Sequence, residues 1–195
     1  MRQLPDKKSA RRQPKQRRSH QTIQVVLEGA VKVLGREGVD AVTTNRIAEA
    51  AGVSIGSLYQ YFPDKHAIFR ALHEAHGRRV RLLLEGTVSS HATCSLESLI
   101  LAILDRLIDE HSEDPRELHQ LLSLQPQEGG LRHALASILK LRDPALSSCP
   151  RGTQFVLPNL IDVLVHETIL SRPGDLSLAA AKEEASRAVV GYLRA

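Results

Sequence analysis

The sequence predicts an all-α fold, and three observations support this prediction. Apolar residues recur at intervals of three and four residues, the spacing of one helix face, in segment after segment of the chain. Gly and Pro residues separate these segments, as at Gly52, Pro115 and Pro173. No segment alternates apolar and polar residues over the length of a strand, and no internal repeat is found. We therefore expect a three-helix unit that contains a helix-turn-helix, followed by a second helical domain.

The positive charge of the chain is concentrated at its N-terminus. Residues 1–18 contain eight Lys or Arg and one Asp, a local charge of +7, and because the whole chain carries +4, the remaining residues carry −3. With two Pro, several Gln and almost no apolar residues, this arm is expected to be disordered by itself. A basic arm attracts polyanions, and nucleic acid is the first candidate. A solvated terminus without a partner explains the composition equally well.

The composition also indicates the cellular compartment in which the protein is expected. Cys94 and Cys149 lie far apart without metal-ligand spacing, which favours two packed residues in a reducing compartment. The chain has no apolar run of about 20 residues that could cross a bilayer. Its basic start lacks the apolar segment of a secretory signal. We expect a cytoplasmic protein that does not bind membranes.

The N-terminal half begins with two predicted helices. The first starts at about Thr22 and ends near Gly35, with an apolar stripe along one face. Thr43 and Thr44 are candidate N-caps for a short second helix over residues 45–51.

Two further helices follow the turn at Gly52. Ser54 can cap a third helix that runs to about Tyr61. Asp64 can cap a fourth, which extends to about Glu85 and so measures about 33 Å at 1.5 Å per residue. Two short helices joined by a Gly-containing turn form a helix-turn-helix pattern, and the long helix can connect two domains.

The third helix has two faces of different chemistry. Leu58 and Phe62 share the face that is expected to pack on the preceding helices. The opposite face carries small or hydrogen-bonding residues, which suit the floor of a DNA major groove: Gly56, Ser57, Tyr59 and Gln60. Their hydroxyl and amide groups can bond base edges, and the tyrosine hydroxyls can reach phosphates. Half-buried packing with a solvated hydroxyl is the alternative interpretation of the tyrosines.

The position of Lys65 is a further indication that this part of the chain binds an anion. It stands at the first position of the fourth helix, where the helix dipole disfavours a cation by roughly a few tenths of a kcal/mol. A bound phosphate would reverse the sign of that interaction. We expect Lys65 and nearby amides to hold one phosphate, and Thr44 with the start of the second helix to hold another.

The run TTNRIAEAAGVSIGSLYQYFPDKHAIF, residues 43–69, resembles the DNA-binding segment of the TetR/AcrR family of bacterial transcriptional regulators. The similarity extends from about Ser19 to Leu72. In that family the positions that commonly approach DNA correspond to Thr43, Thr44, Ile55, Gly56, Ser57, Tyr59, Gln60, Tyr61 and Lys65, to which the charge of the arm adds Arg17 and Arg18. Ile55 stands where the family often has Lys, which predicts a weaker phosphate or guanine contact and a preference for a thymine methyl group.

The resemblance also implies a domain organisation. A disordered arm, residues 1–18, precedes a DNA-binding domain over residues 19–65, with the motif at about 43–62. A connecting helix, residues 66–86, leads to a helical domain, residues 87–195, that binds an effector and forms the dimer.

In the second half we expect helices at about 95–112, 115–124, 128–142, 153–171 and 177–194. Segment 153–171 is apolar around most of its circumference, which indicates that a second subunit covers part of it. Pro158 either kinks this helix or marks a start near Asn159. With segment 177–194 it resembles the family's four-helix dimer interface, for which the candidate residues are Leu160, Leu164, Ala181, Ala185, Ala188 and Tyr192.

The family resemblance implies an effector pocket in the same domain. Its candidate residues are Ile103, Leu107, His119, Leu122, His133, Phe155 and His166. An ordinary core explains the apolar members of this set about as well, and a surface position is the commoner one for a lone His.

Enzyme, metal and cofactor functions find little support. The chain has no nucleophile elbow, phosphate-binding glycine loop or HExxH motif. His73 and His76 lack further ligands nearby, so we expect no metal and no cofactor. The sequence predicts a homodimeric regulator, a repressor that an unknown small-molecule effector releases from double-stranded operator DNA. The alternative is a nonspecific nucleic-acid-binding or architectural protein, which explains the arm but not the face of the third helix.

Overall fold

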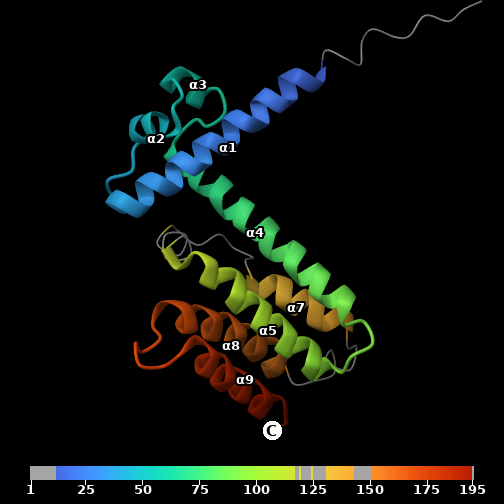
Figure 1. Ribbon diagram of the computed structural model, residues 1–195. Helices are drawn as coiled ribbons and strands as arrows, with labels where there is room; N and C mark the ends of the chain where they lie inside the picture. The colour runs from blue at the N-terminus through green and yellow to red at the C-terminus, as the bar shows by residue number, and fades with distance from the viewer. Residues whose placement is uncertain (1–11, 117–118, 120–123, 125–130, 143–150, 195) are drawn as a thin grey trace, which may run out of the picture. The chain divides into compact units, whose positions relative to one another are not determined.

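A computed structural model describes residues 12–116, 119, 124, 131–142 and 151–194, and all regular secondary structure in these residues is helical (Figure 1). The prediction of an all-α fold is therefore confirmed. The expected segment 115–124 lies largely outside the described residues. The helices are α1 (Arg12–Glu37), α2 (Thr44–Ala51), α3 (Ile55–Tyr59), α4 (Lys65–Ser90), α5 (Leu96–Glu113), α7 (Leu131–Arg142), α8 (Arg151–Leu170) and α9 (Leu178–Arg194).

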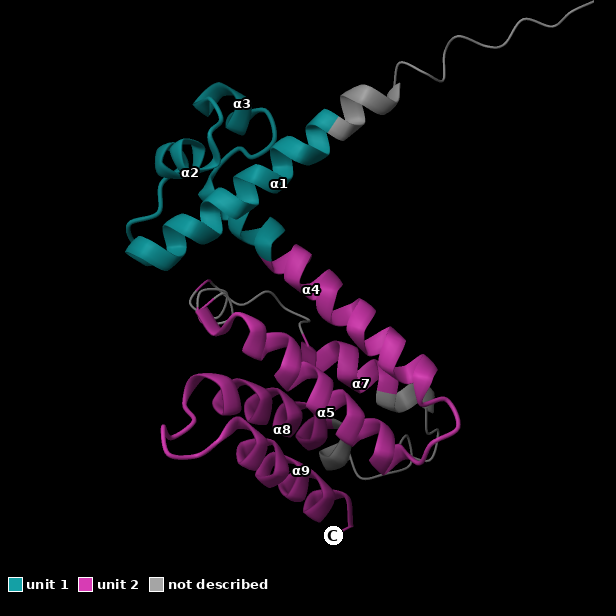
Figure 2. Ribbon diagram, viewed as in Figure 1, with its two compact units in different colours: residues 1–72 teal, residues 73–195 magenta. Residues whose placement is uncertain are grey.

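The chain divides into two compact units, residues 1–72 and 73–195, and the division falls inside α4 (Figure 2). The buried side chains of Ile68, Phe69 and Leu72 thus belong to unit 1. Gly86 does not end α4, which continues to Ser90, because a single Gly inside a helix lowers its stability by only about 1 kcal/mol.

Helix α1 begins earlier than expected. It starts at Arg12, so residues 12–18 are helical, and this corrects the expectation that the whole arm over residues 1–18 lacks regular structure. Residues 1–11 lie outside the described part of the chain. A helix that is anchored further along by packing propagates readily into a polar segment, because each added residue gains one hydrogen bond.

In unit 1, α1 packs against α2, and α2 contacts α3. The core of this packing consists of buried apolar side chains: Val26, Ala30, Val33, Leu34, Val42, Ile47, Ala48, Leu58 and Phe62. Gly29 permits an unusually close approach, since a Cβ atom at that position would lie 2.8 Å from the Cβ of Ala51 and 2.9 Å from its backbone nitrogen. Helix α2 therefore lies almost directly against the backbone of α1.

In unit 2, α5 is the central buried helix. Its fully buried side chains are Leu99, Ile100, Ile103, Leu104, Leu107 and Ile108. Helix α8 packs against α5, α7 and α9, and α9 also packs against α5. Pro158 lies inside α8, so the suggested start near Asn159 is wrong, because the helix already runs from Arg151.

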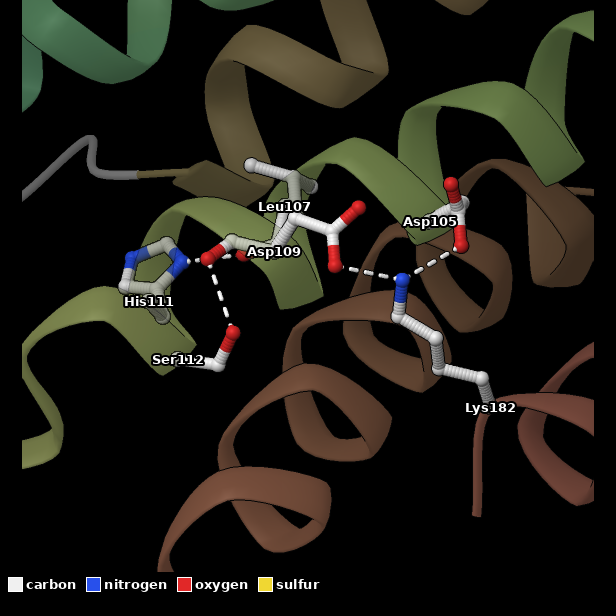
Figure 3. A network of polar contacts seen from close by, with 6 residues as sticks. All are labelled: Asp105, Leu107, Asp109, His111, Ser112 and Lys182. Carbon is white, nitrogen blue, oxygen red and sulfur yellow. Dashed lines mark hydrogen bonds and ion pairs between the residues drawn. The ribbon is translucent and has the colours of Figure 1, made fainter. Parts of the chain in front are cut away.

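Ion pairs fix α9 on α5. The Lys182 ammonium lies 2.7 Å from the Asp105 carboxylate and 2.5 Å from that of Asp109, one turn further along α5 (Figure 3). Arg194 donates two hydrogen bonds to Glu97 at 2.7 and 3.1 Å, near the other end of α5. None of the helices in the described residues is both long and apolar enough to cross a membrane.

Candidate nucleic-acid interface

The turn between α2 and α3 is built by capping side chains, as the sequence predicts. Thr43 caps α2 by accepting a hydrogen bond from the amide of Arg46, and Ser54 caps α3 by accepting one from the amide of Ser57. Gly52 ends α2 with φ of 67°, in the left-handed region where Gly has no Cβ penalty. These contacts fix the direction of α3 relative to α2.

Helix α3 is shorter than expected, since it ends at Tyr59, but its two faces separate as predicted. Leu58 is fully buried and Phe62 is nearly so. Gly56, Gln60 and Thr43 are exposed, and so are Tyr59, with 51% of its surface accessible, and Ile55, with 38%. Thr44, Ser57, Tyr61 and Lys65 are half-buried. Unit 1 thus presents an exposed row of polar and small side chains above an apolar base.

The two tyrosines are both fixed by hydrogen bonds within unit 1. The Tyr59 hydroxyl lies 3.0 Å from the Thr44 hydroxyl at the start of α2. The Tyr61 hydroxyl donates to the Ser19 hydroxyl of α1 at 3.3 Å. Side chains that are already held in place lose less conformational entropy when they bind a ligand.

The polar groups around Lys65 form hydrogen bonds within the protein that the sequence does not indicate. Its ammonium donates to the Val42 carbonyl at 3.3 Å, and an ammonium has three N–H donors, so two remain for an anion. At the start of α4 the Asp64 carboxylate accepts from the amide of Ala67 at 2.7 Å. An anion at this helix start would therefore meet a carboxylate as well as the lysine.

The basic residues of unit 1 differ in how they are placed. Arg18 is exposed on α1, whereas the side chain of Arg17 lies outside the described part. Arg46, which sequence reasoning did not select, is half-exposed on α2 and forms an ion pair with Glu37 at the end of α1. No local sequence signal predicts this pair, because it depends on how α1 and α2 pack.

The candidate effector residues of unit 2 differ in how exposed they are. Ile103 and Leu107 are buried in the core, His119 and His133 are exposed, and Phe155 is 70% accessible. Leu122 lies outside the described residues. His166 is half-buried, and its Nδ1 lies 3.8 Å from a carboxylate oxygen of Asp162.

The structure also brings His166 close to His111, which in turn lies close to His76. The ring of His111 lies 6.2 Å from that of His166 and 5.2 Å from that of His76, measured between ring centroids. Burial lowers the pKa of His76 to about 4, and the nearby His111 adds to this effect. Burial also lowers the pKa of His166, which Asp162 only partly offsets. No group of three or more metal-ligating residues with a suitable geometry occurs in the described ranges.

The candidate dimer residues divide into two groups. Ala181 and Ala185 are buried within the single chain, and Leu160, Leu164 and Tyr192 pack partly against its core. Ala188 is exposed.

Helix α8 carries exposed apolar side chains that were not among the predicted interface residues: Val156, Val163 and Leu170. These three are spaced by seven residues and therefore share one helix face.

Comparison with known proteins identifies the family to which the chain belongs. The sequence pattern of the family described as "Bacterial regulatory proteins, tetR family" matches residues 26–72. The chain is also 30% identical over 114 residues to the uncharacterized HTH-type transcriptional regulator TtgW of Pseudomonas putida, a match that covers 58% of this chain and 81% of TtgW. The chain belongs to the TetR family of bacterial regulatory proteins.

Two further similarities were found, one to a curated protein and one to a solved structure. The chain is 39% identical over 95 residues to the nucleoid occlusion factor SlmA of Actinobacillus pleuropneumoniae serotype 5b, which covers 47% of this chain and 45% of SlmA. The chain thus matches less than half the length of that relative. A crystal structure of a TetR-family transcriptional regulator from Streptomyces coelicolor has the same fold, with a TM-score of 0.65, 22% identity and coverage of 89% of this chain and 98% of that one.

Proposed function

We propose that this TetR-family protein is a sequence-specific DNA-binding transcriptional regulator that reads duplex DNA with α3. The observation that carries the proposal is the arrangement of α3, which is anchored through buried Leu58 and Phe62 and presents Gly56, Tyr59 and Gln60 to solvent. A rigid helix with a polar, sterically small outer face fits the major groove, where base edges present their hydrogen-bonding pattern.

Around α3, other groups are suited to hold the DNA backbone. Thr43 and Thr44 lie at the start of α2, and Lys65 keeps two donors beyond its bond to the Val42 carbonyl. Contacts of this kind position a protein on the duplex without reading its sequence. Arg17, Arg18 and the rest of the basic arm are expected to add phosphate or minor-groove contacts.

The proposal includes a homodimer formed through α8 and α9. Val156, Val163 and Leu170 repeat every seven residues on an exposed face of α8, and α9 adds small exposed residues such as Ala188 and Gly191. An apolar stripe with this period is the pattern by which helices pack against one another in a bundle. A dimer also lets two α3 helices read two half-sites of an operator about 34 Å apart.

We further propose that a small-molecule effector bound by unit 2 releases the protein, as a repressor, from its operator. Members of the TetR family bind operator DNA, dimerise and bind small-molecule ligands. Because effector and DNA affinities are linked, a tenfold weakening of DNA binding needs a coupling of about 1.4 kcal/mol, and DNA must weaken effector binding by the same factor.

A nonspecific nucleic-acid-binding or architectural role is the second candidate, and the charge of +7 on residues 1–18 favours it. The two roles differ in what they predict for binding to unrelated duplexes. A regulator distinguishes its operator from random DNA by a large factor, whereas an architectural protein binds both with a similar, strongly salt-dependent affinity.

The experiment that tests the proposal is selection of bound fragments from the bacterial genomic DNA, followed by sequencing. We expect a recurrent palindromic site, bound by the wild type and lost in Tyr59→Ala, with Arg106→Ala as a control because Arg106 is exposed on α5 of unit 2. Fragments without a common sequence, retained equally by both variants, would establish the architectural role instead.

A further inference from the structure

Three helices of unit 2 each contribute one residue to a histidine cluster: His76 of α4, His111 of α5 and His166 of α8. His76 and His111 face each other, with 3.4 Å between their Nε2 atoms and 5.2 Å between their ring centroids. His111 is buried, with 4% of its surface accessible, and His76 is half-buried. Two imidazole nitrogens from different helices therefore meet at a place that solvent reaches only in part.

The two distances between these rings are those expected of two ligands of one metal ion. Nitrogens that bind a tetrahedral Zn²⁺ at about 2.0–2.1 Å lie about 3.3–3.4 Å apart. Because Nε2 lies about 1.2 Å from its ring centroid, the same ion sets the centroids about 5.2–5.3 Å apart, whereas rings that point straight at each other would have centroids about 5.7 Å apart. The observed separations of 3.4 and 5.2 Å agree with two ring nitrogens directed at one ion.

The other ring nitrogen of His111 is held as it is in metal sites. Its Nδ1 lies 2.6 Å from the Leu107 carbonyl, and since a carbonyl oxygen can only accept, Nδ1 is the donor (Figure 3). In neutral His111 the proton is then on Nδ1, and Nε2 carries a lone pair. Histidines that bind a metal almost always donate their other N–H to a carbonyl or carboxylate, which fixes the orientation of the ring. His111 is thus already oriented as a ligand.

His76 needs one rearrangement to become the second ligand. Without an ion, Nε2 of His76 donates to His111, and Nδ1 of His76 accepts from Nη2 of Arg79 at 3.4 Å. An ion on Nε2 requires the proton to move to Nδ1, so the ring stays neutral but Arg79 must turn away. The side chain of Arg79 is 48% accessible, so it can turn toward solvent. Its positive charge therefore opposes the ion, and its removal should strengthen binding.

The groups around the pair suit a cation. Nε2 of His73, on the same helix as His76, is buried without a hydrogen-bond partner in the described residues. Glu110 on α5 and Asp162 on α8 add negative charge, since the first pairs with Arg79 and the second lies 3.8 Å from the ring of His166. Burial lowers the pKa of His76 to about 4, so at neutral pH almost no added proton competes with an ion.

We propose that His76 and His111 form a binding site for one divalent transition-metal ion of the Zn²⁺ type, which joins α4 to α5 in unit 2. No third ligand is in place in the part of the chain that the structure describes, so water completes the coordination, as it does in open metal sites. Imidazole nitrogens favour Zn²⁺, Ni²⁺ and Cu²⁺ over Mg²⁺, which takes oxygen ligands. The site involves no DNA and is independent of the proposed function.

The test uses the full-length chain without an affinity tag at about pH 7.5, and Zn²⁺ binding is measured by competition with a chromophoric chelator. We expect one ion per chain, with a dissociation constant of roughly 1–100 µM for two protein ligands. His76→Gln and His111→Gln should each weaken binding at least about tenfold, because each removes one of the two ligands. His91→Gln is the matched control, since His91 lies just beyond α4 and its ring contacts the Thr87 carbonyl.

Arg79→Ala tests the geometry in the opposite direction. It keeps both ligands and removes the cation that faces Nδ1 of His76, so Zn²⁺ should bind at least about threefold more tightly. Arg78→Ala is its control, because Arg78 is exposed on the same helix and its ion-pair partner is Glu74. Hydrogen exchange gives a second readout: Zn²⁺ should slow exchange in both α4 and α5 of the wild type, but not in His111→Gln.

Two results would overturn the site. The first is the absence of Zn²⁺ binding up to about 1 mM, or competition by Mg²⁺ at the same concentration. The second is binding that His76→Gln and His111→Gln leave unchanged, which would assign the ion to other histidines of the chain. If neither glutamine variant folds, Arg79→Ala decides, and an affinity equal to that of Arg78→Ala and the wild type would overturn the site.

Discussion

The hydroxyl of Tyr61, two residues beyond α3, donates to the hydroxyl of Ser19 on α1, so a residue next to the recognition helix is tied to a residue next to the basic arm. We predict that Tyr61→Phe and Ser19→Ala each weaken specific DNA binding, by roughly 0.5–1.5 kcal/mol, because each removes the same hydrogen bond. Fluorescence anisotropy with the selected duplex measures the effect. The double variant should lose no more than either single variant, and additive losses would show that the two hydroxyls act independently.

The close approach of α1 and α2 at Gly29 gives a prediction for stability. Gly29→Ala places a Cβ atom 2.8 Å from the Ala51 Cβ and 3.0 Å from the Ile47 carbonyl, and two helices must move apart to relieve the clash. We expect urea unfolding to show a loss of about 1–3 kcal/mol. Gly86→Ala is the control, since a Cβ there meets no atom of the described residues within 4 Å, apart from the neighbouring backbone of α4 itself, and improves the helix propensity of α4.

Lys65 is predicted to contact the DNA backbone with the donors that its bond to Val42 leaves over. Lys65→Ala should therefore weaken binding to every duplex and reduce the slope of log K against log salt by about one unit. Titrations at several salt concentrations measure both quantities. The control Arg106→Ala removes an exposed cation from α5 and should leave the slope unchanged.

The stability of the protein should depend on pH through His76. Its pKa in the folded protein, about 4, is below the ordinary value of 6.5, so the unfolded chain binds more protons between these two values. The contribution of His76 is therefore fully present above about pH 6.5 and decreases as the pH falls toward 4, by on the order of 3 kcal/mol. Urea unfolding of the wild type and of His76→Gln across this range measures it. A variant that loses stability as steeply as the wild type would contradict the assignment.

Val163 is predicted to lie in the dimer interface. It is 54% accessible in the single chain and shares a helix face with Val156 and Leu170. Val163→Asp buries a charge in the interface and should give monomers in analytical ultracentrifugation. Leu82→Asp is the control: Leu82, on α4, is 69% accessible and lies outside the proposed interface, so dimers should persist.

Sequence reasoning identified unit 1 more completely than unit 2, and the reason is physical. In α2 and α3 the caps, the left-handed Gly52 and the buried Leu58 are local features with residue-specific signatures. Helix α8 is apolar around most of its circumference, so the spacing of its apolar residues could not show which of them face the core. In the structure Leu157, Ile161 and Val165 face the core. Val156 and Val163 face solvent.

The histidine cluster was beyond prediction for a related reason. His76 and His111 are separated by 35 residues and meet only because α4 and α5 pack together. In the sequence His111 is one polar residue after an apolar stripe, and such a residue more often marks the end of a buried face than a position within it. The bond of Lys65 to Val42 is likewise a tertiary contact without a local signal.

The continuity of α4 across the boundary between the units restricts how this chain can be recombined with its relatives. A junction at Leu72 and His73 cuts a helix and not a loop. One residue inserted there rotates the rest of α4 by about 100° around the helix axis. The buried face of α4 before the junction, with Ile68 and Leu72, then no longer keeps its orientation relative to the buried face after it, with Val80 and Leu84. A chimera therefore needs a junction without inserted residues, or an insertion of about seven residues, which restores the relative orientation of the two helix faces to within about 20°.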